Sequence, residues 1–254
     1  MTDRPFRAPA ASVTRQWMIL ASAVAVLALV AGSPVYAWSS GAGGPFVVGA
    51  VLGFVAVVVA SWRSITLARQ RVGVEPITPA TWLTASRGGT LVILAGFLLI
   101  ARPPDAFAWV PATLFAVAAG LDAVDGTLAR ATDDVSELGS RLDVEIDSLT
   151  VLVGTLLAIQ YDVVPVAFLV VGLSRYAFVA GIRYRRWAGR PVYDLDPSTP
   201  RRVLGALAMV TIWLALSPIP GPAPTRVLAV VVLFPFVANF ARDWLVVSGR
   251  RRHT

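Results

Sequence analysis

Three residue types that often carry chemistry are absent or nearly absent from this sequence. It contains no cysteine and no lysine, and its single histidine, His253, lies next to the C-terminus. The absence of cysteine excludes disulfides, thiolate metal sites and a cysteine nucleophile. One histidine in the tail argues equally against a histidine-based catalytic mechanism and against a histidine-rich metal site.

Charge is also scarce, whereas apolar residues are abundant. Of the 254 residues, 56% are hydrophobic and only 15% are charged. This balance is typical of a polytopic membrane protein and not of a soluble domain. All the positive charge comes from arginine, and the net charge is +7. Such a charge fits nucleic acid, anionic lipid or membrane topology, and the positions of the arginines decide between them.

Eight stretches are apolar enough to be membrane helices, which need roughly 20 residues each. Arginines crowd the N-terminus, the second and sixth connections and the C-terminus, while the first, third, fifth and seventh connections have almost none. This positive-inside pattern predicts a multi-pass protein of the cell (cytoplasmic) membrane with both termini in the cytoplasm. Membrane topology is enough to explain where the arginines lie, and we therefore do not expect nucleic acid as a partner. The eight stretches are residues 17–37, 46–62, 80–100, 107–124, 139–160, 163–181, 203–218 and 225–247.

The first stretch has an alternative interpretation. It begins with basic residues and ends in Val35-Tyr36-Ala37, which loosely resembles a signal-peptide cleavage site. We favour a retained helix, because the following loop is short and leads directly into another apolar stretch.

The segment from Leu121 to Thr150 holds eight of the fifteen acidic residues. At about 100° per residue in a helix, Asp122 and Asp125 fall on one face, together with Gly126, Ala129 and Arg130. Downstream, Gly139, Asp143 and Asp147 recur at intervals of four and share one face of the next helix. Four carboxylates can therefore converge between the ends of two antiparallel helices.

Converging carboxylates next to a membrane need a cation, because each unpaired charge costs several kcal/mol. Hard divalent cations such as Mg²⁺, Mn²⁺ or Ca²⁺ prefer such oxygen ligands. Gly126 lets a bulky group approach the backbone, and Arg130 offers a fork that suits phosphate. A single aspartate at a helix end is most simply an N-cap, but that does not explain four at these spacings. The pattern predicts a metal-assisted diphosphate site.

The same residues resemble the complete signature of the CDP-alcohol phosphotransferase family. They read Asp122-x2-Asp125-Gly126-x2-Ala129-Arg130-x8-Gly139-x3-Asp143-x3-Asp147, and the resemblance extends from Pro79 to Val247. It implies an all-α polytopic membrane protein with a six-helix core, here preceded by two additional N-terminal transmembrane helices. The expected division is an N-terminal extension at residues 1–78 and a six-helix membrane domain at residues 79–254.

The resemblance also implies an activity and a set of roles. The family transfers a phosphatidyl-type group from a CDP-linked lipid to a small alcohol, releases CMP, and is expected to use one or two Mg²⁺ or Mn²⁺ ions in a homodimer. Asp147 is also the expected base for the acceptor hydroxyl. The expected metal ligands are Asp122, Asp125, Asp143 and Asp147, and the expected cytidine-phosphate pocket is formed by Gly126, Ala129, Arg130 and Gly139.

Residues 78–87, TPATWLTASR, resemble the entry to the first core helix of the family, which often reads TPANxLTxxR. Thr81 stands where asparagine is usual, whereas Thr84 and Arg87 match and are expected to bind substrate. Pro79 suits the first turn of a helix. An alternative for Arg87 is an interfacial charge that snorkels to the headgroups.

The acceptor is the least determined part of the prediction. Arg175 falls inside an apolar stretch, where a charge is usually functional or paired. Arg183, Arg201 and Arg202 flank the long sixth connection and are further candidates to bind an acceptor phosphate. A lysine-rich GKxKT-like element found in relatives that use phosphorylated acceptors is missing. We favour a polyol phosphate such as glycerol phosphate or inositol phosphate, with serine as the competitor and a divalent-cation transporter as the alternative from another class.

Overall fold

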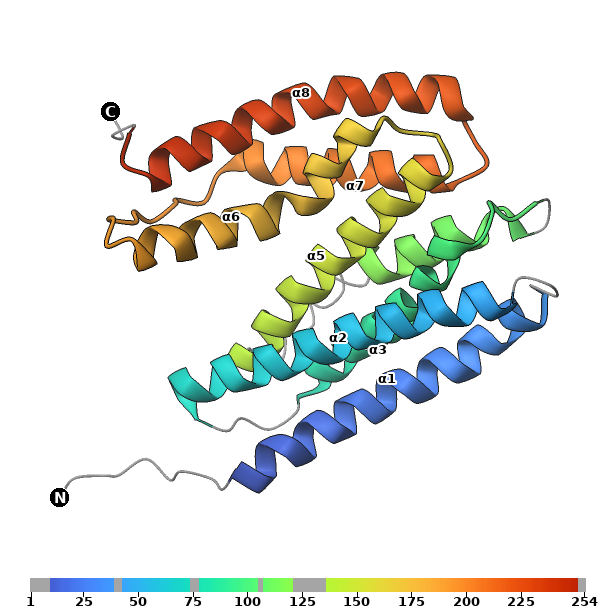
Figure 1. Cartoon of the computed structure of the whole chain (residues 1–254), viewed down its shortest axis with the longest axis horizontal. Helices are drawn as coiled ribbons and strands as arrows, with labels where there is room; N and C mark the ends of the chain where they lie inside the picture. The colour runs from blue at the N-terminus through green and yellow to red at the C-terminus, as the bar shows by residue number, and fades with distance from the viewer. Residues whose placement is uncertain (1–9, 39–42, 74–77, 105–106, 121–135, 251–254) are drawn as a thin grey trace. The chain divides into compact units, whose positions relative to one another are not determined.

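The computed structural model describes residues 10–38, 43–73, 78–104, 107–120 and 136–250, and within these ranges every long element is a helix. The chain forms two compact units, Met1–Val153 and Gly154–Thr254 (Figure 1). The described part of the chain contains no strand, so the predicted all-α class is confirmed.

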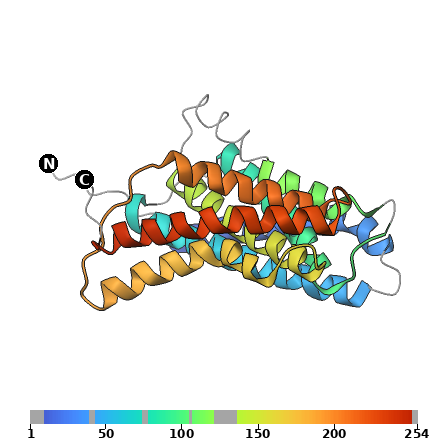
Figure 2. The ribbon, with the colours of Figure 1, turned by 90° about the horizontal axis from the view of Figure 1, so that it is seen from above.

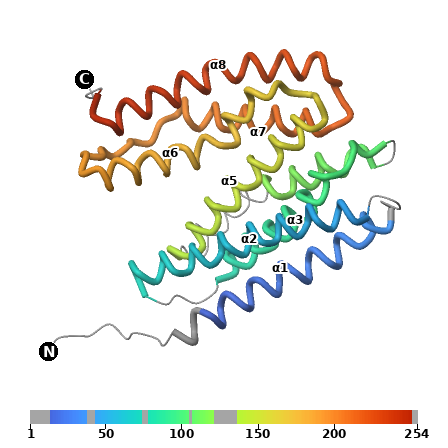
Figure 3. Tube along the Cα trace, viewed as in Figure 1, coloured from blue at the N-terminus to red at the C-terminus, as the bar shows by residue number. Residues whose placement is uncertain are grey.

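Three long helices dominate the first unit: α1 (Ala10–Trp38), α2 (Gly43–Val72) and α3 (Pro79–Gly96), continued by the short helix η1 (Phe97–Leu99). They pack pairwise and run alongside one another with alternating direction (Figures 1 and 3). Of the apolar span in α3, 67% is buried, against 22% in α1 and 28% in α2. α3 is therefore the central helix of this unit, and α1 and α2 cover it.

The sequence of α2 explains how it fits against α3. Its buried residues Phe46, Gly49, Gly53 and Val57 recur at intervals of three or four and form one face. A Cβ atom on Gly49 would lie 2.5 Å from the Ala95 carbonyl oxygen, which is too close for any side chain. The two glycines thus allow the backbones of α2 and α3 to approach closely, as in other membrane helix pairs.

Trp17, near the start of α1, joins α1 to α2. The rings of Trp17 and Trp62 meet edge to face with centroids 5.5 Å apart. The indole nitrogen of Trp17 also donates a hydrogen bond to the Val58 carbonyl oxygen at 3.1 Å. The two tryptophans thus pack against each other. Tryptophan is also the residue type favoured at membrane interfaces.

Side-chain caps begin two of the helices that carry predicted site residues. The Thr78 hydroxyl accepts a hydrogen bond from the Thr81 amide at 3.3 Å, and Pro79 occupies the first turn of α3, as predicted. The Ser136 hydroxyl accepts from the Gly139 amide at 2.9 Å at the start of α5 (Glu137–Gln160). Both caps fix where the helix begins and thereby the phase of its faces.

The second unit contains the end of α5, the short helix η3 (Val166–Phe168), α6 (Leu169–Trp187), α7 (Thr199–Leu216) and α8 (Pro222–Val247). Within it, α8 packs against both α6 and α7, and the three helices run alongside one another (Figure 2). A Cβ atom on Gly181 of α6 would overlap the Trp244 ring of α8, so this glycine sets the spacing of that pair.

Among the described residues, six helices are long and apolar enough to cross a membrane, and the chain is a multi-pass membrane protein. Their outer faces are apolar, with Leu29, Val227 and Phe234 between 64% and 73% exposed, as suits contact with lipid. Of the other two predicted stretches, 139–160 is α5, whose first half carries five charged residues. The stretch 107–124 corresponds to the shorter helix Val110–Gly120 and then leaves the described residues.

Candidate active site

A buried ion-pair cluster joins α3 to α5 inside the first unit. The side chain of Arg87 is fully buried, and its two terminal nitrogens donate to Asp143 and to Asp147, one to each. Its Nε atom donates to the Ala118 carbonyl oxygen at 2.7 Å. Arg87 therefore does not extend to the headgroups as a snorkelling charge would.

The two aspartates come together because they lie four residues apart on α5. One turn of helix separates them, so their carboxylates point in the same direction and can reach the same cation. Each side chain keeps about a quarter of its surface exposed, 27% for Asp143 and 25% for Asp147. Both carboxylates are therefore partly open to a ligand while they pair with Arg87.

Small and polar residues pack where α3 and α5 begin. A Cβ atom on Gly139 would lie 2.9 Å from the Ser136 hydroxyl and 3.4 Å from that of Thr81, so a side chain there would crowd both. Thr84 is buried, and its hydroxyl donates to the Ala80 carbonyl oxygen at 3.1 Å. Thr81, which replaces the usual asparagine, is also buried and lies beside Gly139.

Part of the predicted site lies outside the described residues. In the described ranges, no three acidic or histidine side chains gather in an arrangement that could hold a metal ion. The described pair, Asp143 and Asp147, nevertheless fits a divalent cation, because two carboxylates already converge on a positive group and supply only oxygen ligands. The residues outside the description are Asp122, Asp125, Gly126, Ala129 and Arg130.

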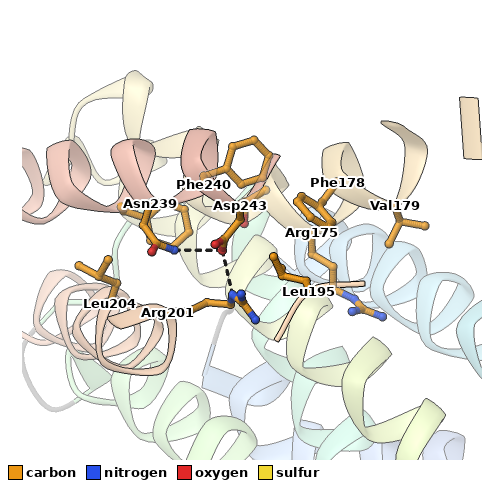
Figure 4. Close-up of a pocket in the computed structure, with 11 residues that line it drawn as sticks. Arg175, Phe178, Val179, Leu195, Arg201, Leu204, Asn239, Phe240 and Asp243 are labelled. Atoms are coloured by element: carbon orange, nitrogen blue, oxygen red, sulfur yellow. Dashed lines mark hydrogen bonds and ion pairs between the residues drawn. The ribbon is translucent and has the colours of Figure 1, made fainter. Parts of the chain in front are cut away.

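A separate cavity of about 190 Å³ lies within the second unit, between α6, α7 and α8 (Figure 4). Two of the predicted acceptor residues, Arg175 from α6 and Arg201 from α7, line it. Aromatic and aliphatic side chains such as Phe178 and Leu204 make up much of the remaining wall. The cavity thus combines an apolar wall with a few charged groups, which is typical of sites for small molecules.

Asp243 and Asn239 of α8 complete the polar lining, and the sequence interpretation did not single them out. Asp243 accepts a hydrogen bond from Arg201 Nε at 2.8 Å and one from the Asn239 amide at 3.1 Å (Figure 4). One sequence signal was present, because Asp243 is the only acidic residue in residues 222–247 and an ionisable residue in an apolar helix is usually functional or paired.

The other two predicted acceptor arginines do not line this cavity. Arg183 and Arg202 are both exposed, on α6 and α7 respectively. Arg185, which was not a candidate, instead fixes the following turn by donating to the carbonyl oxygens of Pro191 and Ser248. The arginines at this end of the unit therefore divide into cavity-lining, structural and exposed groups.

The helices and the buried acid–guanidinium cluster define a multi-pass membrane protein with a charged site held between its helices. A family model described as CDP-alcohol phosphatidyltransferase matches residues 77–247, and the chain belongs to this family. The predicted resemblance is thereby confirmed over nearly the same residues. Comparison with curated proteins and with solved structures returns no match.

Membership assigns the general activity of the chain. It is a membrane CDP-alcohol phosphotransferase, acting on a CDP-alcohol donor and an alcohol acceptor in a lipid bilayer. The family is generally dependent on a divalent metal.

Proposed function

We propose that this protein transfers a phosphatidyl-type group from a CDP-linked diacyl lipid to a polyol phosphate, such as glycerol phosphate or inositol phosphate, with release of CMP. The observation that carries the proposal is the convergence of Asp143 and Asp147 on one cationic group. A site that already holds two carboxylates around a positive charge suits a diphosphate bound through a metal ion.

In this proposal Mg²⁺ or Mn²⁺, as one or two ions, is held by the four aspartates of the motif. When bound, the metal would neutralise charge on the diphosphate of the donor. Gly126, Ala129, Arg130 and Gly139 would line the cytidine-phosphate pocket, with Thr84 and Arg87 beside it. The contacts of Arg87 support a role in holding Asp143 and Asp147 in place, because its two terminal nitrogens donate to these carboxylates.

The chemical step is a displacement at phosphorus. The acceptor hydroxyl oxygen forms a bond to the lipid-bearing phosphorus of the donor, and the bond from that phosphorus to the bridging oxygen breaks, so that CMP leaves. The proton of the acceptor hydroxyl passes to a base, for which we propose Asp147. With histidine restricted to position 253, an aspartate at the site is the available group.

The cavity of the second unit supports a phosphorylated acceptor. Its lining carries two guanidinium groups, Arg175 and Arg201, against the single carboxylate of Asp243. An excess of guanidinium groups favours an anion, and the planar fork of arginine suits phosphate oxygens. Serine also offers an anionic group, its carboxylate, but it carries an ammonium group beside it, which two guanidinium groups disfavour.

We further propose an arrangement in the membrane and an assembly. The arginine distribution supports a site on the cytoplasmic face of the cell membrane with both termini cytoplasmic. Residues 1–78 are proposed as an extension before the six-helix domain at residues 79–254. A homodimer follows from the family resemblance, and light scattering of the detergent-solubilised protein would measure twice the protomer mass.

The test is release of CMP from a CDP-linked diacyl lipid by the purified protein in vesicles. Release should require an acceptor alcohol and Mg²⁺ or Mn²⁺, and chelation should abolish it. Asp147→Asn should lower the rate by at least about 100-fold, since a positioned base contributes roughly 10²–10⁴-fold. Its thermal unfolding should stay close to that of the wild type, because the isosteric side chain can still accept from Arg87.

Asp162→Asn is the matched control. Its side chain is 92% exposed, it pairs only at the surface with Arg226, and asparagine tolerates its positive φ of 54°. This variant should retain full activity. Release of CMP that is insensitive to chelation would contradict the proposal, and so would Mn²⁺ uptake into vesicles that lack any CDP-lipid, which would indicate a transporter.

A further inference from the structure

We infer that Asp243, held by Asn239, is a positioning residue that orients Arg201 to receive the phosphate of the acceptor. The inference deepens the proposed function and rests on it for the identity of the acceptor. It assigns a role to two residues of α8 that no motif singles out.

The guanidinium of Arg201 is fixed from two directions. Its Nε atom donates to Asp243 Oδ2 at 2.8 Å, and its Nη2 atom donates to the Asp196 carbonyl oxygen at 3.2 Å. An arginine has five N–H donors in a rigid fork, so these two bonds set the plane of the group and leave other donors for a ligand. A guanidinium held in one plane loses little freedom when an anion binds.

Asp243 is itself fixed by its surroundings. The residue is only 8% exposed, and Asn239, one turn earlier on α8, donates to the same Oδ2 atom at 3.1 Å. A nearly buried carboxylate is costly unless it is paired, and Arg201 provides that pairing. Asn239 therefore holds Asp243, and Asp243 holds the guanidinium of Arg201 at the wall of the cavity (Figure 4).

The cavity is suited to a small anionic group. Its volume of about 190 Å³ is somewhat larger than that of an engineered cavity that holds benzene, roughly 150 Å³, so a small molecule fits. Arg175 lines the same cavity from α6. An acceptor that carries a phosphate can form charge-assisted hydrogen bonds with the guanidinium of Arg201, which are stronger than those of an uncharged alcohol.

A purely structural role for the pair makes a different prediction. If Arg201 and Asp243 only clamp α7 to α8, their loss should lower stability and reduce all kinetic constants together. If Asp243 positions Arg201, its loss should act on the acceptor alone. The KM of the acceptor, compared with the KM of the CDP-lipid and with kcat, separates the two roles.

The first experiment measures these constants for the full-length protein in vesicles with a CDP-linked diacyl lipid and glycerol phosphate. Asp243→Asn keeps the shape of the side chain and removes its charge. We expect it to raise the acceptor KM about tenfold, as loss of a supporting partner commonly does, with the CDP-lipid KM and kcat within about twofold of the wild type. Asp162→Asn and Arg226→Gln disrupt an exposed arginine–aspartate pair of the same unit and should leave every constant unchanged.

The exchanged double variant Arg201→Asp/Asp243→Arg restores the ion pair but moves the guanidinium to α8. We expect its thermal unfolding temperature to recover towards the wild type while its acceptor KM remains raised. Recovery of the acceptor KM in this double variant would overturn the inference. The inference would also be overturned if Asp243→Asn changed the KM of the acceptor and the KM of the CDP-lipid equally, or changed neither.

Direct binding distinguishes failure of the inference from failure of the proposed function. Glycerol phosphate and inorganic phosphate, titrated into the detergent-solubilised protein, should raise the unfolding temperature of the wild type, and Asp243→Asn should need about tenfold more ligand for the same rise. Binding without any CMP release would contradict the proposed function and support the inference. CMP release with serine, together with no stabilisation by either phosphate, would overturn the inference and retain the general activity.

Discussion

Arg87 is the most constrained charged residue in the described part of the molecule. Its side chain has no exposed surface. It forms ion pairs with two carboxylates and donates a hydrogen bond to one backbone carbonyl oxygen. Removing a single partner from a buried cluster leaves the other charges uncompensated, and this costs more than the net benefit of the pair. The residue therefore supports the fold and holds the shape of the aspartate pair at the same time.

Arg87→Met should destabilise the protein by about 3–5 kcal/mol, because two partly buried carboxylates lose their counter-charge. Thermal or denaturant unfolding in detergent measures this change. Arg71→Gln is the control, since Arg71 is 70% exposed and meets Glu137 only at 3.8 Å, and a surface pair of this kind contributes about 0–1 kcal/mol. Equal effects of the two substitutions would contradict a buried structural role for Arg87.

Glycines determine how closely the helices of the first unit pack. Gly49 meets the Ala95 carbonyl and the backbone of Gly96, and Gly53 meets the Ala95 side chain, where an added Cβ would approach to 2.5 Å. Lipid tails are as apolar as leucine, so membrane helices associate through close packing and not through a hydrophobic driving force. Loss of this fit removes the main attraction between α2 and α3.

Gly49→Val should separate α2 from α3 and destabilise the first unit by roughly 1–3 kcal/mol, because overpacking forces the backbones apart. Gly44→Val is the matched control in the same helix, because a Cβ at that position meets nothing within 4 Å. The unfolding temperatures of the two variants in detergent provide the comparison. An unchanged temperature for Gly49→Val would contradict the close approach of the two helices.

The distribution of charge along the whole chain predicts its orientation in the membrane. Arginine-rich connections alternate with connections that are nearly free of arginine, and the sixth connection is the most basic of all. Translocation of such segments is disfavoured, so we expect them to remain in the cytoplasm. The absence of cysteine makes the orientation easy to measure, because any introduced thiol is unique.

Two single-cysteine variants test the orientation in intact cells with a thiol reagent that does not cross membranes. Arg190 lies in the basic connection after α6, and Ala223 lies in the first turn of α8, and both are exposed. Arg190→Cys should react only after the cells are opened, whereas Ala223→Cys should react in intact cells. The reverse pattern would invert the proposed topology and move the site to the other face.

The sequence by itself determined the membrane class, the helical periodicity and the family, because each depends on local properties of the chain. Apolar stretches of sufficient length predict helices in a bilayer, where backbone groups must bond within their own segment. The spacing of four between Asp143 and Asp147 likewise predicted a shared face, since it follows from the geometry of a single helix. Within the described residues, six of the eight predicted stretches form helices long and apolar enough to span a membrane.

Only the tertiary structure decided which distant side chains meet. Arg87 and Asp147 are 60 residues apart, and Arg201 and Asp243 are 42 apart, so neither pair follows from any local pattern. The length and flexibility of arginine allow it to reach the headgroups or a buried carboxylate equally well, and the packing of neighbouring helices selects between them. Helix packing depends in turn on where small residues allow backbones to approach, which is why the positions of Gly49 and Gly181 matter as much as those of the charged residues.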